Sequence, residues 1–421
     1  MREEIKQRID QIRRGEVPEG YKKTKVGVVP EEWEETTLSE YLFVNNDKNE
    51  NLRYGKEDVF SISGDLGIVN QIDLLGRSYA GASVAPYGVV YPNDVVYTKS
   101  PLKANPYGII KTNLTENVGI VSTLYAIFHC KNNVCPKFVQ DYFSWDHRLN
   151  NYLFPIVNIG AKHDMKISDE NSLKGVVVFP PLAEQEKIAE ILQTQDKVIE
   201  LQQKKIDELK RLKKVYLSKM FPKKGCNVPE IRFPGFTDPW EQRKLGDVCQ
   251  ITMGQSPDGA TYSDVPSDYI LVQGNADLKN GWVFPRVWTT QKTKTAEAGD
   301  LIMSVRAPAG AMGKTNYNVV LGRGVAGIKG NEFIYQTLVK MDEDGYWKKL
   351  AAGSTFESIN SDVISNAEIA VPQDIDEQEK LGAYFHNLDN LITLHQRKLD
   401  EEQKKKKALM QLLLTGIVRT V

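Results

Sequence analysis

The chain has 421 residues, more than one hydrophobic core usually serves, so we expect two globular domains of roughly 150 residues plus connecting elements. Hydrophobic residues make up 41% of the chain and charged residues 26%, a balance that excludes a largely disordered or fibrous protein. The formal net charge is −1, so binding to nucleic acid would require basic residues gathered on one face rather than an overall basic surplus.

The first residues favour a cytoplasmic protein. In residues 1–24, MREEIKQRIDQIRRGEVPEGYKKT, charged side chains surround single isoleucines, which predicts a helical segment and not a signal peptide. No later stretch approaches the 18 or so uncharged apolar residues of a membrane span. The four cysteines and five histidines show no zinc-ligand spacing. We therefore expect neither a membrane nor a metal as a partner.

An internal duplication determines the expected architecture. Near its start, each of residues 25–182 and residues 223–375 has a tryptophan that is followed five residues later by a leucine: Trp33 with Leu38, and Trp240 with Leu245. In the middle of each copy a turn opens an apolar run that ends at a basic residue, and these landmarks are Asp94 with Lys99, and Asp300 with Arg306. Short strand-like runs and glycine, proline or asparagine turns lie between, so each copy is expected to be a mixed α/β domain.

Each copy is followed by a long helical pattern, in residues 183–222 and 376–416. The sequence Glu-Gln-Glu-Lys begins both, at Glu184 and at Glu377, and apolar residues then recur at spacings of three and four. We expect helices from about Glu184 to Met220 and from about Glu377 to Leu414, each roughly 55 Å long. Because one apolar stripe needs a partner, the two helices should pack as a coiled coil. Three polar residues interrupt the stripe, and they are either tolerated at an open seam or set the register: Gln195, Gln202 and His395.

Motifs for catalysis are weak. Gly313-Lys314-Thr315 resembles the end of a phosphate-binding loop, but Pro308 stands where that loop needs its first glycine. No methyltransferase tetrapeptide and no glycine-rich cofactor fingerprint occurs. Two groups faintly resemble the carboxylate–lysine cluster of metal-dependent nucleases, although turn carboxylates explain them better: Asp94 with Lys99, and Asp258 with Asp264 and Asp268. We predict that this chain has no catalytic activity and no cofactor of its own.

With both copies in view, the chain resembles the specificity (S) subunit family of type I restriction-modification systems over almost its full length. The segments that carry the resemblance are Gly20–Thr24, Pro30–Trp33, Pro180–Gln185 with Ile188, Arg232–Phe236, Gly254–Pro257 and Leu388–Leu399. The resemblance implies an α+β protein, in which two similar target-recognition domains are separated by two long antiparallel coiled-coil helices with a pseudo-two-fold internal repeat. One departure is that Pro372 lies five residues before Glu377, whereas Pro180 lies four before Glu184, which predicts a different second joint.

The resemblance also implies partners. Each domain would read one half of a split double-stranded DNA target, and the helices would dock two modification (methyltransferase) subunits and set the unread spacer. Those subunits would supply S-adenosylmethionine and methylate adenine, and restriction (motor and nuclease) subunits would add chemistry that needs ATP and magnesium. Two other functions remain open on the sequence alone: a nuclease or methyltransferase with a divergent site, and a scaffold whose helices merely join subunits.

Candidate contact residues follow from this division of labour. Side chains that read bases must reach base edges, so we choose polar or basic residues on predicted turns: Lys99, Lys103, Lys162 and His163 in the first domain, and Gln255, Arg306, Arg323 and Ser354 in the second. Lys99 and Arg306 fall at matching places in the duplication, and the alternative is that such residues are simply solvated. The candidate partner-binding residues begin the helices: Glu184, Gln185, Ile188, Glu377, Gln378 and Leu381.

Overall fold

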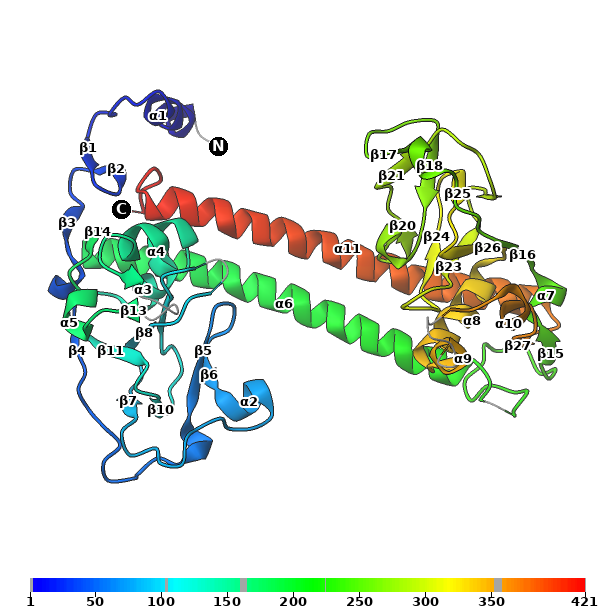
Figure 1. Ribbon diagram of the computed structural model, residues 1–421, viewed down its shortest axis with the longest axis horizontal. Coiled ribbons are helices and arrows are strands. Elements are labelled where there is room, and N and C mark those ends of the chain that lie inside the picture. Colours follow the sequence, from blue (N-terminus) through cyan, green and yellow to red (C-terminus); the bar gives the residue numbers. More distant parts are fainter. Residues whose placement is uncertain (1–2, 103–104, 160–164, 224, 352–357, 421) are drawn as a thin grey trace. The chain divides into compact units, whose positions relative to one another are not determined.

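Both long helical patterns form continuous helices in the computed structural model, which describes residues 3–102, 105–159, 165–223, 225–351 and 358–420 (Figure 1). Helix α6 spans Leu182–Met220 and helix α11 spans Ile375–Leu414. Each begins two residues before its predicted start, and the predicted ends are confirmed. No helix within the described ranges is long and apolar enough to cross a lipid bilayer.

The chain folds as two compact units that share the long helices. Unit 1 consists of Met1–Glu200 and Asp400–Val421, and unit 2 consists of Leu201–Leu399. The predicted domain ranges placed the helices outside the domains, whereas each compact unit includes one end of each helix. The reason is hydrophobic burial, because Ile188 of α6 belongs to the core of unit 1 and Leu217 of α6 belongs to the core of unit 2.

Unit 1 contains one four-stranded antiparallel sheet and several paired strands. The sheet has the order β4 (Leu42–Val44), β11 (Tyr125–Cys130), β8 (Val95–Thr98) and β9 (Ile109–Thr112). Beside it, β5 (Phe60–Ser63) pairs with β6 (Gly67–Asn70), and β10 (Gly119–Val121) pairs with β7 (Gly88–Val90). A parallel bridge between Val59 and Ile120 joins the two pairs, so their order is β6-β5-β10-β7.

Unit 2 contains two larger sheets. The first has the order β16 (Gln250–Met253), β26 (Val325–Lys329), β23 (Leu301–Ser304), β24 (Met312–Lys314), β20 (Trp282–Val283) and β19 (Leu278–Lys279). The second has the order β17 (Tyr262–Ser263), β21 (Val287–Thr289), β18 (Tyr269–Val272), β25 (Val319–Leu321) and β22 (Thr295–Ala296).

Strand pairing shows that the duplication in the sequence is a duplication of the fold. The order β4-β11-β8-β9 in unit 1 corresponds to β16-β26-β23-β24 in unit 2, and β6-β5-β10-β7 corresponds to β21-β18-β25-β22. The strands β6-β5-β10-β7 and their counterparts β21-β18-β25-β22 each include one parallel contact, between β5 and β10 in unit 1 and between β18 and β25 in unit 2. A third antiparallel pair precedes each long helix: β3 (Glu34–Thr37) with β14 (Val176–Phe179), and β15 (Glu241–Lys244) with β27 (Glu368–Val371). The predicted internal repeat is confirmed.

Shorter elements complete the units. In the described part of unit 1 these are α1 (Glu3–Arg13), β1 (Tyr21–Thr24), β2 (Gly27–Pro30), α2 (Gln71–Leu75), α3 (Pro136–Phe143), α4 (Asp146–Leu153), β12 (Asn158–Ile159), β13 (Met165–Lys166) and α5 (Asp169–Ser172). In unit 2 they are α7 (Leu245–Val248), α8 (Glu332–Glu343), α9 (Tyr346–Ala351) and α10 (Ser361–Ser365). The predicted helical segment over residues 1–24 is therefore helical only in its first half, because Gly15 has a left-handed φ of 81° just after α1 and the chain then forms β1.

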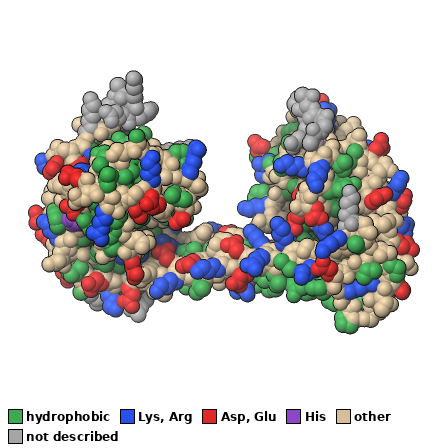
Figure 2. All heavy atoms as spheres, turned by 90° about the horizontal axis from the view of Figure 1, so that it is seen from below, with side chains coloured by type: hydrophobic (Ala, Val, Ile, Leu, Met, Phe, Trp, Pro, Cys, Tyr) green, Lys and Arg blue, Asp and Glu red, His purple; other side chains and the backbone are tan. Residues whose placement is uncertain are grey.

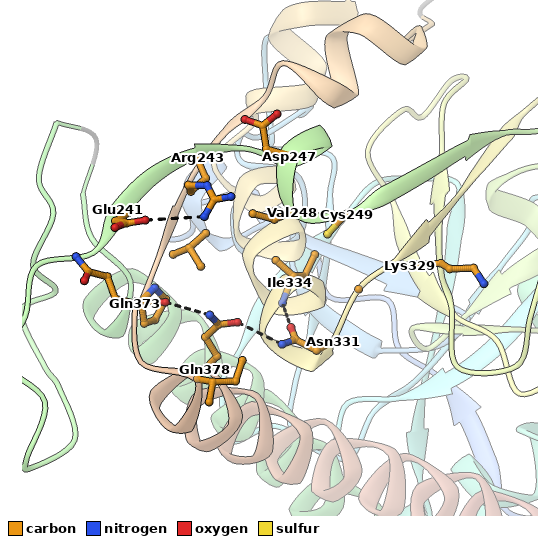
Figure 3. A pocket seen from close by; sticks show the side chains of 14 residues that line it. Glu241, Arg243, Asp247, Val248, Cys249, Lys329, Asn331, Ile334, Gln373 and Gln378 are labelled. Carbon is orange, nitrogen blue, oxygen red and sulfur yellow. Dashed lines mark hydrogen bonds and ion pairs between the residues drawn. The ribbon is translucent and has the colours of Figure 1, made fainter.

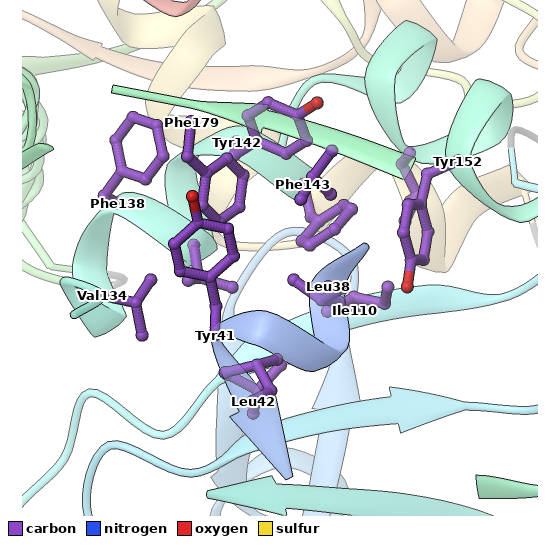
Figure 4. Packing of buried hydrophobic residues seen from close by; sticks show 14 of the residues in the cluster. Leu38, Tyr41, Leu42, Ile110, Val134, Phe138, Tyr142, Phe143, Tyr152 and Phe179 are labelled. Carbon is purple, nitrogen blue, oxygen red and sulfur yellow. The ribbon is translucent and has the colours of Figure 1, made fainter. Parts of the chain in front are cut away.

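Aromatic side chains fill the core of each unit. In unit 1 the rings of Tyr41, Phe138 and Tyr142 gather around Phe179 of β14, with centroid separations of 4.7, 5.1 and 4.9 Å (Figure 4). In unit 2, Phe221 stacks on Phe333 of α8 with centroids 5.5 Å apart. Phe179 and Phe221 each lie at one end of α6, so each core holds the helix end that enters it.

The helices pack antiparallel within each unit, and polar residues pair across them. In unit 1 the Gln195 side-chain amide donates to the backbone oxygen and the carboxylate of Glu402, at 3.2 and 2.6 Å. In unit 2 the Gln202 side-chain oxygen lies 2.9 Å from His395 Nδ1. The three residues that interrupt the apolar stripe thus have specific partners, which favours the register-setting interpretation over a tolerated open seam.

Candidate nucleic-acid interface

The residues that begin helix α6 bind other parts of unit 1. The buried Glu184 carboxylate accepts hydrogen bonds from the Trp33 indole at 3.1 Å and from the Arg419 guanidinium at 2.8 and 3.0 Å. Hydrogen bonding to Glu184 raises the pKa of Arg419. Gln185 donates to the Pro180 carbonyl at 2.9 Å. Glu184 and Gln185 therefore fasten the helix to the strand before it and to the segment after α11.

The start of α11 in unit 2 repeats this joint. Arg232 donates two hydrogen bonds to the buried Glu377 carboxylate, at 2.7 and 2.8 Å. Gln378 donates to the Pro372 carbonyl at 3.0 Å and accepts from Asn331 at 3.3 Å, on the wall of a cavity of about 720 Å³ (Figure 3). The extra residue after Pro372 does not prevent the hydrogen bond that its counterpart Pro180 makes.

These contacts give most of the predicted partner-binding residues a place inside their own unit. Glu184, Gln185 and Glu377 are each 1% exposed, and Ile188 and Leu381 belong to the two cores. Gln378 is partly exposed. Their contact with a modification subunit stays a prediction, while their role in fixing the long helices follows from the geometry.

The motif that resembled a phosphate-binding loop lies in a strand. Lys314 ends β24, its ammonium group lies 2.9 Å from the Glu332 carboxylate, and it sits over the rings of Trp282 and Tyr335. A phosphate-binding loop instead connects a strand to a helix and keeps its lysine free for the phosphate. Lys314 is therefore part of the unit 2 core.

The acidic residues of the faint nuclease pattern are turn residues. Asp94 is 2% exposed, accepts a hydrogen bond from the Tyr91 backbone N–H at 2.8 Å and lies 2.6 Å from His129 Nδ1. Burial raises the pKa of its carboxyl group. Asp258 accepts a hydrogen bond from the Ala260 backbone N–H at 3.0 Å and so caps the turn that follows it. These carboxylates are used by the fold, as the turn explanation predicts.

Metal ligands do not gather within the described ranges, and two of the thiols there are poorly reactive. No group of three or more histidine, cysteine, aspartate or glutamate side chains there could hold a metal ion. Burial raises the pKa of Cys130 to about 12 and that of Cys249 to about 11, which keeps both thiols protonated and poorly nucleophilic.

Three of the predicted DNA-contact residues of unit 2 come together at one edge. Gln255, Arg306 and Arg323 are far apart in the chain, and all three side chains are exposed. The backbone hydrogen bonds that join their segments run from Gly254 N to Val325 O at 2.9 Å, from Gln255 N to Leu321 O at 2.8 Å, and from Val305 N to Gly324 O at 2.9 Å. The Arg323 N–H also donates to the Ser256 hydroxyl at 3.1 Å. We call this set of turns, with Gln255, Arg306 and Arg323, the unit 2 edge.

Glycines allow the turns of the unit 2 edge to approach so closely. A Cβ atom at Gly254 would lie 2.0 Å from the Gly322 carbonyl oxygen, and one at Gly324 would lie 2.1 Å from the Gln273 carbonyl oxygen. Any other residue would push the turns apart. The edge is therefore a firm platform, which suits side chains that must meet base edges at fixed positions.

Lys99 of unit 1 is placed differently from Arg306. The Lys99 ammonium group pairs with Asp169 and its side chain is only 18% exposed, whereas Arg306 is exposed. The two residues do not match in the duplication, because Lys99 is five residues after Asp94 and Arg306 is six residues after Asp300. A shift of one residue along a strand turns a side chain to the opposite face. The other predicted contacts, Lys103, Lys162, His163 and Ser354, lie outside the described residues.

Charge on the surface is mixed. In the face shown in Figure 2, basic and acidic side chains are interspersed over both units. The unit 2 edge is a local exception, since the exposed Lys292 and Lys294 flank Thr293, whose hydroxyl donates to the Gln255 carbonyl at 2.7 Å. Neither lysine stands out in the sequence, because their closeness to Gln255 arises from the fold.

Segments of both units match one known protein family. A model of the type I restriction modification DNA specificity domain matches residues 130–211 and 237–402, which is more than half of the chain. The chain therefore belongs to the type I restriction modification DNA specificity family.

Individual proteins are also similar to this chain over most of its length. The chain is 26% identical to the putative type I restriction enzyme MjaX specificity subunit of Methanocaldococcus jannaschii, over 95% of this chain and 97% of that protein. Its fold is similar to that of the type I restriction-modification S subunit from M. genitalium, with a TM-score of 0.58, 12% identity, and coverage of 90% of this chain and 96% of that one. A chain from a structure of a type I R-M system is also similar, with a TM-score of 0.55, 20% identity, and coverage of 93% and 99%.

Proposed function

We propose that each unit of this DNA specificity subunit reads one half of a bipartite double-stranded DNA target. The observation that carries the proposal is the unit 2 edge, where Gln255, Arg306 and Arg323 stand exposed on closely packed turns. Arginine pairs with the major-groove edge of guanine and glutamine with that of adenine, so this edge has the donors and acceptors that base reading needs. The flanking lysines supply phosphate contacts that hold the register.

The long helices are the proposed docking elements for two modification subunits. Apolar side chains are exposed on both helices within unit 2: Leu201, Leu212 and Val215 of α6, and Leu391 and Leu394 of α11. Exposed apolar rows on helices mark surfaces that another protein covers. A partner that inserts helices beside α6 and α11 would remove these side chains from water.

We further propose that the chain is not catalytic. Lys314, Asp94 and Asp258, which gave weak catalytic signals, are engaged in the fold. S-adenosylmethionine would be held by the modification subunits, and ATP and magnesium would be used by restriction subunits. This chain would supply the DNA sequence specificity that determines where those subunits act.

Reconstitution tests the proposal. The purified chain, alone or with its modification subunit, is incubated with DNA and labelled S-adenosylmethionine, and titrations of the chain alone with S-adenosylmethionine and with magnesium are followed by calorimetry. We expect methyl incorporation at a two-part target only with the partner present, and no heat of binding for either compound. Methylation of DNA or metal-dependent cleavage by the chain alone would instead support a divergent enzyme.

A further inference from the structure

The correspondence between the units identifies which part of unit 1 is equivalent to the unit 2 edge. Lys48 is four residues beyond the end of β4 at Val44, and Gln255 is four residues beyond Ile251, the counterpart of Val44 in β16. Lys48 forms a bridge with Gly88 at the start of β7. In unit 2, the β7 counterpart β22 follows Lys294, whose neighbour Thr293 contacts Gln255.

The turn that carries Arg323 also has a counterpart. Gly322-Arg323-Gly324 joins β25 to β26, and Ser122-Thr123-Leu124 joins β10 to β11, so both turns have three residues and connect equivalent strands. Thr123 is exposed and Leu124 is 64% exposed, so both side chains are accessible to a ligand.

The backbone around Lys48 is held firmly while its side chain is exposed. Val89 N donates to the Asp47 carbonyl at 3.0 Å, and Asn49 N donates to the Tyr87 carbonyl at 2.9 Å. Asn49 is 1% exposed, and its side chain donates to the Tyr54 carbonyl at 2.8 Å. Fixed neighbours on both sides place the Lys48 ammonium group on a defined part of the surface.

We propose that Lys48, Thr123 and Leu124 form the DNA-reading edge of unit 1. This inference rests on the proposed function of the two units and names the residues that would carry it in unit 1. Lysine donates to guanine O6 and N7, threonine contacts several base edges, and an apolar side chain contacts the thymine methyl group. Lys48, Thr123 and Leu124 occupy a scaffold equivalent to that of Gln255 and Arg323, so the two units read different base pairs with one architecture.

Selection from DNA libraries tests the proposal with the full chain and its modification subunit. The probe is double-stranded DNA in which both half-targets, first located by methylome mapping, are randomised. Bound DNA is sequenced for the unchanged chain, for Lys48→Ala and Thr123→Val, and for Arg323→Ala of unit 2. Lys174→Ala, at an exposed lysine before β14, is the matched control in unit 1. Because the altered side chains are exposed, melting temperatures should change little.

We expect Lys48→Ala and Thr123→Val to lower base discrimination roughly tenfold at one or two positions of one half-target, the usual effect of losing one base contact. Arg323→Ala should do the same in the other half-target, and Lys174→Ala should change neither. If Arg323→Ala relaxes its half and the unit 1 variants relax none, the reading edge of unit 1 is wrong while the proposed function stands. If no variant in either unit alters any position, the assignment of reading to both edges fails.

Discussion

A matched insertion into both long helices tests whether they set the spacer between the half-targets. The chain passes between the units only at residues 200/201 in α6 and 399/400 in α11. Four residues added at both points lengthen each helix by about 6 Å. They also rotate the part of the helix beyond the insertion by about 40° more than a full turn. Since DNA rises about 3.4 Å and turns about 35° per base pair, two added base pairs match the length and leave an angular error of about 30°.

The insertion points keep each unit's own helix pairing intact. The Gln195–Glu402 contact stays within unit 1 and the Gln202–His395 contact stays within unit 2. We expect methylome mapping of the variant to show both half-targets unchanged and the gap longer by one or two base pairs. A matched two-residue insertion is the control, because it rotates the units by about 200° and should abolish recognition of the joined target. An active four-residue variant with an unchanged gap would show that the long helices do not set the spacer between the half-targets.

Two further predictions concern the stability of the folded units. Arg419→Ala leaves the buried Glu184 carboxylate without its cation, so unit 1 should lose roughly 3 kcal/mol of unfolding free energy while unit 2 does not, and Arg232→Ala should have the converse effect. Native-state hydrogen exchange resolves the units, and equal losses in both would contradict this assignment. Burial raises the pKa of the Asp141 carboxyl group above its ordinary value of 3.8, so the folded chain keeps this proton at pH values where the unfolded chain has lost it, and stability should fall as pH rises through that window. Asp141→Asn should flatten that slope in urea unfolding measured at several pH values, and an unchanged slope would show that Asp141 does not cause it.

The sequence predicted the architecture well because its signals are local or repeated. The tryptophan-to-leucine spacing and the Glu-Gln starts of the helices recur in both copies, and the length of the apolar stripes predicted the ends of α6 and α11. What the recurring Glu184 and Glu377 do was not predictable, since their partners Arg419 and Arg232 lie 235 and 145 residues away.

The candidate site was predicted only in part, because it depends on strand register. Gln255 and Arg323 were chosen as separate turn residues, and their approach follows from glycine packing between distant turns. Lys99 was matched with Arg306 by chain order, although strand pairing aligns Val95 with Leu301 and so makes Val305 the counterpart of Lys99. Lys48 lies in a polar loop without any local pattern, so it is identified only by strand register and by its bridge to Gly88.

Because unit 1 contains both ends of the chain, its folding can be completed only after unit 2 has been synthesised. Leu413 and Leu414 of α11 belong to its core, and Arg419 closes on Glu184, yet these residues leave the ribosome only after all of unit 2. The part of unit 1 made first must therefore wait with an incomplete core, while unit 2 is contiguous and can fold as it emerges. A message cut short anywhere in unit 2 yields a chain in which neither unit is complete, so truncated products expose apolar surface to chaperones and proteases and should not compete for partners.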